Sequence, residues 1–245
     1  MQLVKTILSF NLSSLSECIF LRRLNRFTVL VESNGTMLEA HLNNTGRLLN
    51  VLKPGVKGFL VETKSGRLGY RLLGVYVDGG VAVLDTLTQE KAFARAVEEG
   101  LIPWLKDCSV AGRNKRISDI IVDYQLECGG REVYVELKSA ILDLNGYAGY
   151  PDAPSERGRR HIRVLGDLAS KGFKTMVVFV ASIPGAKGFR LYCREDKLIG
   201  RTAWEALSKG LLFKSISIYF DPISLSIMLE DPDLHVDLCS ECSDI

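Results

Sequence analysis

A short segment in the middle of the chain combines a carboxylate and a lysine in a strand-like pattern. In the run 133–138, the alternation of a β-strand places Glu136 and Lys138 on one face and Val133, Val135 and Leu137 on the other. A central strand rarely carries two opposite charges side by side, because removing an ion pair from water costs free energy that the pair does not always recover. The pattern therefore indicates a chemical role for Glu136 and Lys138.

The preceding residues predict a hairpin that brings a second carboxylate to the same place. If Gly129 and Gly130 form a two-residue turn, Asp123 lies directly across from Glu136. Two opposed carboxylates repel each other unless a cation lies between them, and a divalent ion with oxygen ligands meets that need. Asp119 shares the strand phase of Asp123 but would lie further along the hairpin, so it is the weaker candidate.

This arrangement of side chains suits the hydrolysis of phosphodiesters. Bound Mg²⁺ or Mn²⁺ lowers the pKa of a water and neutralises charge on the phosphate, while the ammonium of Lys138 orients the water or stabilises charge. The spacing alone leaves a second interpretation open, in which an exposed hairpin carries Asp123, Glu136 and Lys138 only as solvated charges.

The elements before this segment predict a small β-barrel. Short strands alternate with turn signals such as Asn34-Gly35 and Asp78-Gly79-Gly80, and no stretch before Asp85 has the length of a helix. This pattern favours an OB-like barrel. The expected strands are 27–32, 36–41, 58–63, 71–77 and 81–84.

Beyond Asp85 the pattern changes to alternating helices and strands. The order α-β-β-β-α-β-α-β-β predicts a mixed sheet flanked by helices. The expected helices are 87–99, 154–170 and 200–209, and the expected strands are 117–126, 132–139, 141–148, 175–181, 215–220 and 225–229, with 113–116 in a loop. We therefore expect an OB-fold-like nucleic-acid-binding domain over 1–85, a nuclease-like α/β domain over 86–230 and an acidic tail over 231–245.

Charge is distributed unevenly along the chain. The 31 Lys and Arg residues against 29 Asp and Glu leave a net charge of only +2. Residues 1–83, however, carry ten basic and five acidic residues, whereas residues 230–245 carry six acidic residues and no basic one. The body of the protein is therefore basic enough to bind nucleic acid.

Composition and cysteine usage narrow the class of protein. A content of 47% hydrophobic and 24% charged residues excludes disorder and collagen, and no apolar run is long enough for a membrane segment. We expect a cytoplasmic protein, with Cys18, Cys108, Cys128 and Cys193 as buried thiols. Cys239 and Cys242 have the spacing of a metal or redox pair, but without a second pair we interpret them as incidental or as a disulfide of the tail.

Basic residues form two candidate surfaces for DNA. Arginines with adjacent aromatic residues on the barrel suit a single-strand groove, although an exposed sheet face would look the same. Cations at the positive N-terminus of the helix 154–170 are explained by an external anion, although His161 could equally be a packed core residue. The candidates are Arg22, Arg23, Arg26, Arg116, Arg157, Arg159, Arg160 and His161.

Several spaced motifs together give a more specific signal. Asp123 followed by Glu136-Leu-Lys138 on the next strand resembles the PD-(D/E)XK nuclease superfamily, and the chain resembles the sugar fermentation stimulation protein A family across 20–229. The motifs are Arg22-Arg-Leu-Asn-Arg-Phe27, Asn44-Thr-Gly-Arg47, Glu98-Glu-Gly-Leu-Ile-Pro103, Asp123-Tyr124, Tyr134-Val-Glu-Leu-Lys-Ser139 and Tyr150-Pro-Asp-Ala-Pro-Ser-Glu-Arg-Gly-Arg-Arg-His161.

The resemblance implies a function and a set of site residues. It implies an N-terminal OB-fold, a C-terminal nuclease-like domain, DNA binding and a role in regulating sugar (maltose) metabolism. It makes Asp123 and Glu136 metal ligands, Lys138 the catalytic lysine and Glu98 a possible further ligand. Supporting positions are Asn44, Thr45, Glu156 and Asp119, the last an alternative to Asp123.

Three functions remain open at this point. The first is a DNA-binding nuclease that depends on Mg²⁺ or Mn²⁺, and the second is a DNA-binding transcriptional regulator that retains the nuclease fold without cutting. The third is a metal-binding or structural interaction protein that does not bind nucleic acid, which the modest net charge of +2 would suit. Whether the DNA is single- or double-stranded is open, and so is a homodimer.

Overall fold

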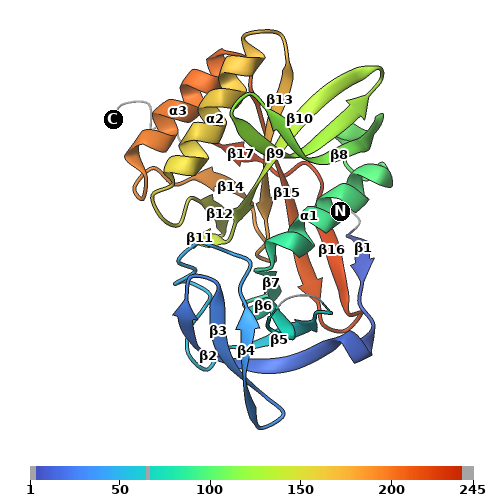
Figure 1. The fold of residues 1–245 in the computed structure, drawn as a ribbon, viewed down its shortest axis with the longest axis vertical. Coiled ribbons are helices and arrows are strands. Elements are labelled where there is room, and N and C mark those ends of the chain that lie inside the picture. The colour runs from blue at the N-terminus through green and yellow to red at the C-terminus, as the bar shows by residue number, and fades with distance from the viewer. Residues whose placement is uncertain (1–3, 65–66, 239–245) are drawn as a thin grey trace.

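The computed structural model describes residues 4–64 and 67–238 and shows a barrel below a larger α/β unit (Figure 1). The barrel strands pair in the order β4-β3-β2-β5-β6, and a parallel contact of His41 with Arg71 joins β4 to β6 and closes the ring. This is the predicted OB-type barrel. Its strands are β2 (Leu15–Asn25), β3 (Thr28–Ser33), β4 (Thr36–His41), β5 (Lys57–Glu62) and β6 (Tyr70–Val77).

Local sequence explains the barrel. Asn34 and Gly35 have φ of 51° and 72°, so the β3–β4 hairpin has the left-handed turn that Asn-Gly favours. Alternate residues Val29, Val31 and Ala40 are fully buried inside the barrel, while their neighbours are more exposed.

The larger unit is built on a mixed sheet with the order β7-β15-β13-β10-β9-β8. Strands β10, β13 and β15 are parallel neighbours, whereas β8, β9 and β10 form an antiparallel meander. The strands are β7 (Gly80–Val83), β8 (Cys108–Ile117), β9 (Ile120–Cys128), β10 (Arg131–Ala140), β13 (Lys174–Ala181), β15 (Leu212–Asp221) and β16 (Ser226–Asp231). A smaller sheet contains β11 (Leu142–Leu144), β12 (Tyr147–Tyr150), β14 (Gly188–Leu191) and β17 (Val236–Asp237).

Helices cover the two faces of this sheet. Val177 and Phe179 of β13 share one core with residues of α2 (Glu156–Ala169) and α3 (Lys197–Ser208), whereas Met176 and Val178 share the other core with Phe93 of α1 (Thr86–Glu98). A strand buried on both faces is apolar without interruption, which explains the sequence of β13. No helix among the described residues is long and apolar enough to cross a membrane.

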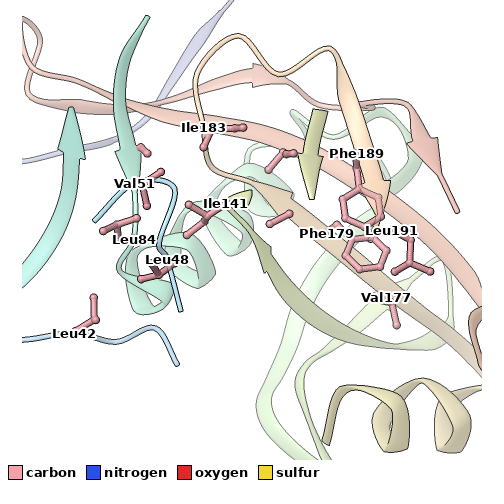
Figure 2. Close-up of a cluster of buried hydrophobic side chains, with 14 of the residues drawn as sticks. Leu42, Leu48, Val51, Leu84, Ile141, Val177, Phe179, Ile183, Phe189 and Leu191 are labelled. Atoms are coloured by element: carbon pink, nitrogen blue, oxygen red, sulfur yellow. The ribbon is translucent and has the colours of Figure 1, made fainter. Parts of the chain in front are cut away.

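The barrel and the sheet share a continuous apolar core. Figure 2 shows Leu42, Leu48 and Val51 of the barrel side facing Ile141 and Ile183 of the larger unit. At the far end of this cluster, the rings of Phe179 and Phe189 stack with centroids 3.7 Å apart. The two parts therefore hold a defined orientation, and a site can be built from both.

The structure differs from the sequence-based expectations at several elements. Residues 113–116 lie on strand β8 and not in a loop, and the expected strand 141–148 is two short strands, β11 and β12. Strand β1 (Lys5–Ser9) pairs with β16, so the first residues described join the C-terminal sheet and not the barrel. The expected tail does not begin at 231, because Leu234 is buried and β17 pairs with β14.

The interpretation of the cysteines as separate thiols was wrong for three of the four. Cys108 and Cys128 lie opposite each other on β8 and β9 and form a disulfide, and Cys193 is also disulfide-bonded. Cys18 is a buried free thiol as expected, and burial raises its pKa to about 12. Cys239 and Cys242 lie outside the described residues.

Candidate functional site

The predicted carboxylates and lysine line one cavity of about 430 Å³. The cavity lies where the β9–β10 hairpin, the first turn of α1, the loop 43–46 of the barrel and the segment 150–158 meet. Asp123 comes from β9, and Glu136 and Lys138 come from β10. The tertiary fold thus brings together the three residues that the strand pattern singled out.

The hairpin register explains how Asp123 reaches Glu136. Residues pair as Arg131 with Cys128 through Val135 with Tyr124, the predicted register. The ladder ends at that last pair, and the carboxylate of Asp123 instead accepts a hydrogen bond of 2.6 Å from the amide of Leu137. The two strands separate at this point, which creates room for the cavity.

Glu136 is the most enclosed of the three side chains. Its Oε1 lies 2.5 Å from Nζ of Lys138 and 2.7 Å from Nδ1 of His161. Burial raises the pKa of Glu136, but Lys138 and His161 more than offset burial, so that the pKa lies below its ordinary value. Its Oε2 is buried and has no hydrogen-bond partner, which leaves one ionised oxygen free to bind a cation.

Lys138 and Asp123 respond to the same environment in different ways. Burial disfavours the ammonium of Lys138, but Glu136 offsets this effect and holds the pKa of Lys138 above its ordinary value. Lys138 is therefore a cation at neutral pH and not a base. Burial and then the charge of Glu136 raise the pKa of Asp123 to about 7.

A further carboxylate, Glu90 of α1, also lines the cavity. Burial raises its pKa, and Arg113 at 3.2 Å opposes that effect. The residue predicted from the sequence was Glu98, which lies two helical turns further on and accepts a hydrogen bond of 2.7 Å from the amide of Val110. The available signal was helical spacing, because Thr86, Gln89 and Glu90 share one helix face.

The donor set fits a hard divalent cation. Asp123 and Glu136 provide oxygen ligands, and the unpartnered Oε2 of Glu136 is an acceptor that a cation would satisfy. Across residues 4–64 and 67–238, no three Asp, Glu, His or Cys side chains are close enough together to hold an ion by themselves. Two carboxylates are a set that a divalent ion such as Mg²⁺ typically binds, with waters and substrate phosphates completing its shell.

A loop of the barrel forms one wall of the cavity. Asn44 is buried and donates to the carbonyl of Leu84 and to Oγ of Ser139, both at 3.3 Å. The guanidinium of Arg23 donates to the carbonyls of Asn44, Gly46 and Arg26, which fixes the loop from below. Thr45 is exposed in the same wall. Asn44 and Arg23 therefore shape the site.

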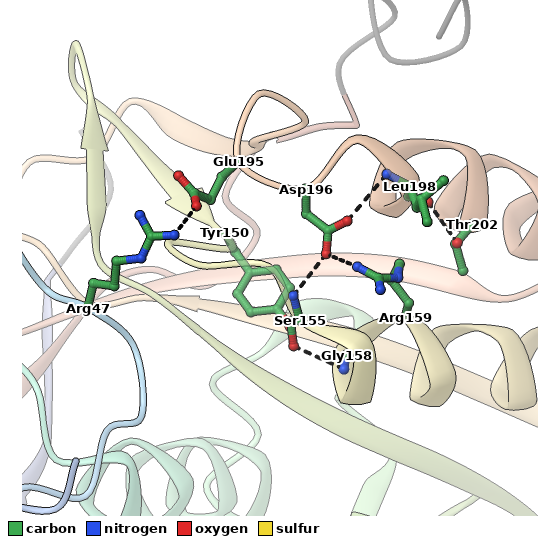
Figure 3. A network of polar contacts seen from close by, with 9 residues as sticks. All are labelled: Arg47, Tyr150, Ser155, Gly158, Arg159, Glu195, Asp196, Leu198 and Thr202. Atoms are coloured by element: carbon green, nitrogen blue, oxygen red, sulfur yellow. Dashed lines mark hydrogen bonds and ion pairs between the residues drawn. The ribbon is translucent and has the colours of Figure 1, made fainter.

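The opposite wall is fixed by a polar network around Asp196 (Figure 3). Its carboxylate accepts hydrogen bonds from the amides of Ser155 and Leu198 and forms an ion pair with Arg159. Oγ of Ser155 caps α2 by accepting from the amide of Gly158 at 3.0 Å. The network ties the starts of α2 and α3 together and holds the segment 150–158 at the cavity.

Comparisons with known proteins agree with this architecture. Residues 21–84 match the model described as the SfsA N-terminal OB domain, and residues 87–223 match the sugar fermentation stimulation protein RE domain. The chain belongs to the sugar fermentation stimulation protein family.

Relatives and a solved structure cover nearly the whole chain. A sugar fermentation stimulation protein homolog of Pyrococcus furiosus is 39% identical over 209 residues, covering 85% of this chain and 91% of the relative. One of Archaeoglobus fulgidus is 37% identical over 227 residues, covering 93% and 98%. A structure of Pyrococcus furiosus SfsA in complex with Ca²⁺ matches with a TM-score of 0.90 and 36% identity, covering 95% of this chain and 99% of that one.

The residues predicted to contact DNA lie in separate environments. Arg26 and Arg157 are exposed and line the cavity, and Arg22 and Arg116 are exposed outside it. Arg159 is held by Asp196, and Arg160 pairs with Asp119 at 2.6 Å on the surface.

His161 is buried against Glu136, where it cannot reach DNA. Asp119 and Glu156 are exposed and do not line the cavity. Of the two candidate aspartates, the structure therefore places Asp123, and not Asp119, beside Glu136.

Proposed function

We propose that this protein binds DNA and hydrolyses its phosphodiester bonds with the help of Mg²⁺ or Mn²⁺. One observation supports this most strongly: Oε2 of Glu136 is an unpartnered, buried oxygen in a cavity that also contains Asp123 and Lys138. A purely structural ion pair would satisfy both carboxylate oxygens, because leaving one buried and unpaired destabilises the fold.

The residues of the site would divide the task. Asp123 and Glu136 hold the cation, which would acidify a water and neutralise charge on the phosphate. Lys138, kept protonated by Glu136, donates to that water or to a phosphate oxygen. His161 positions the carboxylate of Glu136 from below, at 2.7 Å.

Arginines at the rim would hold the phosphate backbone. Arg26 and Arg157 line the cavity from opposite walls, one from the barrel and one from α2. Contacts with phosphates fix the position of DNA without reading its sequence. The related Pyrococcus furiosus SfsA was solved in complex with Ca²⁺, which supports the binding of a divalent cation here, since Ca²⁺ also prefers oxygen ligands.

The proposal is tested by the cleavage of labelled single- and double-stranded DNA with Mn²⁺ or with EDTA. Cleavage should require the metal and should fall by about a thousandfold in Glu136→Gln, because the substitution removes the charge that holds the cation. Asp119→Asn is the matched control, and we expect its activity to be unchanged. Asp123→Ala should be far more damaging than Asp119→Ala.

A measurement without cleavage separates the nuclease from a non-cutting regulator. Binding of Mn²⁺ to the native state should raise the midpoint of thermal unfolding in the wild type and not in Glu136→Gln. Salt-sensitive DNA binding with no cleavage in any metal would reject the nuclease and support a DNA-binding regulator of sugar metabolism. The absence of DNA binding would reject both.

A further inference from the structure

An exposed aromatic side chain lies on the barrel beside the cavity. Phe27, at the β2–β3 turn, is 46% exposed, and its ring lies parallel to His41 with centroids 6.4 Å apart and an interplanar angle of 13°. The guanidinium of Arg26 lies 5.6 Å from the centre of the same ring. An exposed phenyl ring with a guanidinium and an imidazole beside it is a typical surface for stacking nucleic-acid bases. We refer to Phe27, Arg26 and His41 as the stacking platform.

The backbone of Phe27 is held in place. Its amide donates to Oδ1 of Asn25 at 2.8 Å, and its carbonyl accepts from the amide of Leu42 at 2.8 Å. Leu42 is fully buried in the core between the barrel and the sheet. The exposed ring therefore projects from an anchored turn, which lowers the entropy lost when a base stacks on it.

Two hollows with a shared lining residue lie near this platform. A second hollow of about 570 Å³ lies on the barrel and is lined by Asn25, His41, Asn43 and Leu87 among others. Asn43 also lines the cavity of Asp123 and Glu136, and Arg26 lies both at the rim of that cavity and over Phe27. A chain crossing Asn43 would pass from the hollow into the cavity.

The cavity is better suited to an extended strand than to a duplex. The side chains of Glu136 and Lys138 are only 5% and 12% exposed, below walls formed by the loop 43–46 and the segment 150–158. A phosphate must therefore enter between two anchored walls to reach the two side chains. A single strand can do so while its bases turn outward, whereas the bases of a duplex stay paired and stacked.

We propose that the substrate of this site is a single-stranded polynucleotide, with one base stacked on Phe27, the adjoining phosphate on Arg26 and the next phosphate in the cavity of Asp123 and Glu136. The position of the cleaved bond rests on the nuclease function proposed above. The preference of the barrel for a single strand over a duplex, called strand selection below, can be tested without cleavage. Because stacking contributes to binding here, part of the affinity should persist at high salt.

The test measures the binding of fluorescein-labelled oligonucleotides in EDTA, where cleavage does not interfere. A 12-mer of dT should bind the full-length protein at least tenfold more tightly than a duplex of equal length. Phe27→Ala should weaken binding to the 12-mer by about tenfold, within the range for loss of a base–aromatic stack, and Phe27→Trp should restore it. Met37→Ala is the matched control, because Met37 is 68% exposed on the same barrel and lines neither cavity.

The outcomes distinguish this inference from the nuclease proposal. Equal or tighter binding of the duplex, or unchanged binding of Phe27→Ala with its fold intact by circular dichroism, would overturn strand selection while Glu136-dependent cleavage could still be present. Selective binding of the 12-mer without any cleavage would support strand selection and reject the nuclease. A 12-mer of ribothymidine bound as tightly as the 12-mer of dT would support stacking on the base, because the two differ only in the sugar, and a tenfold difference would identify which sugar is preferred.

Discussion

Two clusters of buried charge, one that lines the cavity around Glu136 and one that holds its wall around Asp196, differ in how completely their carboxylate oxygens are hydrogen-bonded. In the cluster around Asp196, both carboxylate oxygens have donors: the amide of Leu198 on one, and the amide of Ser155 with the guanidinium of Arg159 on the other. In the cluster around Glu136, Oε1 lies 2.5 Å from Nζ of Lys138 and 2.7 Å from Nδ1 of His161, while the buried Oε2 has no hydrogen-bond partner.

The contrast separates a structural role from a functional one. The charge of Asp196 is compensated by donors from the protein itself. This network therefore stabilises the fold and leaves neither carboxylate oxygen without a donor. The charges around Glu136 are not fully compensated, and burial together with Glu136 raises the pKa of Asp123 to about 7. Such incomplete compensation is typical of sites that are completed by a substrate or an ion.

A substitution in the fully hydrogen-bonded cluster around Asp196 should have the largest effect on stability. Asp196→Ala removes the N-cap of α3, the acceptor of the Ser155 amide and the partner of Arg159, and leaves that guanidinium unpaired. We expect the free energy of unfolding to fall by about 3 kcal/mol. Urea denaturation followed by circular dichroism measures it. Asp196→Asn keeps the cap and should cost less than half as much, and equal losses would contradict a role for the ion pair.

Removing the charge of Asp123 from the cluster around Glu136 should instead stabilise the fold. The pKa of Asp123 in the folded protein, about 7, lies above its unfolded value. The contribution of Asp123 to stability is therefore complete below the unfolded pKa and is lost as pH rises through about 7. In EDTA at pH 8, Asp123→Asn should raise the free energy of unfolding by about 2 kcal/mol, and the gain should shrink at pH 5. Asp119→Asn should leave the free energy of unfolding unchanged at both pH values. A loss of stability in Asp123→Asn at pH 8 would show that the charge of Asp123 does not destabilise the fold.

The sequence predicted the floor of the site because local rules determine it. A Gly129-Gly130 turn sets the register, and a period of two sets the face, so the residue pattern alone was enough to place Asp123, Glu136 and Lys138 together. The Asn-Gly hairpin and the short strands favoured an OB-like barrel for the same reason, and the family resemblance implied the same fold.

The remaining residues depend on tertiary contacts that no local rule contains. Glu90 and Glu98 lie on the same helix about 12 Å apart along its axis, and only the docking of α1 on the sheet decides which one reaches the cavity. Arg159 looked free because its partner Asp196 lies 37 positions away. The disulfide of Cys108 and Cys128 was missed because the polar residues 113–116 concealed strand β8.

The contribution of Glu90 to the proposed metal site around Glu136 can be tested by comparison with Glu98. Glu90→Gln should reduce metal-dependent cleavage by about tenfold, or ~1.4 kcal/mol in the activation free energy, because one partly buried negative charge near the proposed cation is lost. Glu98→Gln should leave cleavage unchanged, since Glu98 is exposed and bonded to the amide of Val110. Steady-state cleavage at saturating Mn²⁺ compares the two, and a larger effect at Glu98 would restore the first assignment.

The two exposed arginines at the start of α2 provide the smallest and most specific comparison. Arg157 lines the cavity, whereas Arg160 is paired with Asp119 on the surface. If Arg157 contacts a phosphate, Arg157→Ala should weaken DNA binding several-fold and reduce the slope of log affinity against log salt by about one. Arg160→Ala removes only an exposed ion pair and should change neither the slope nor the unfolding midpoint. Equal salt slopes in the two variants would mean that DNA follows the outer face of α2 and does not enter the cavity of Asp123 and Glu136.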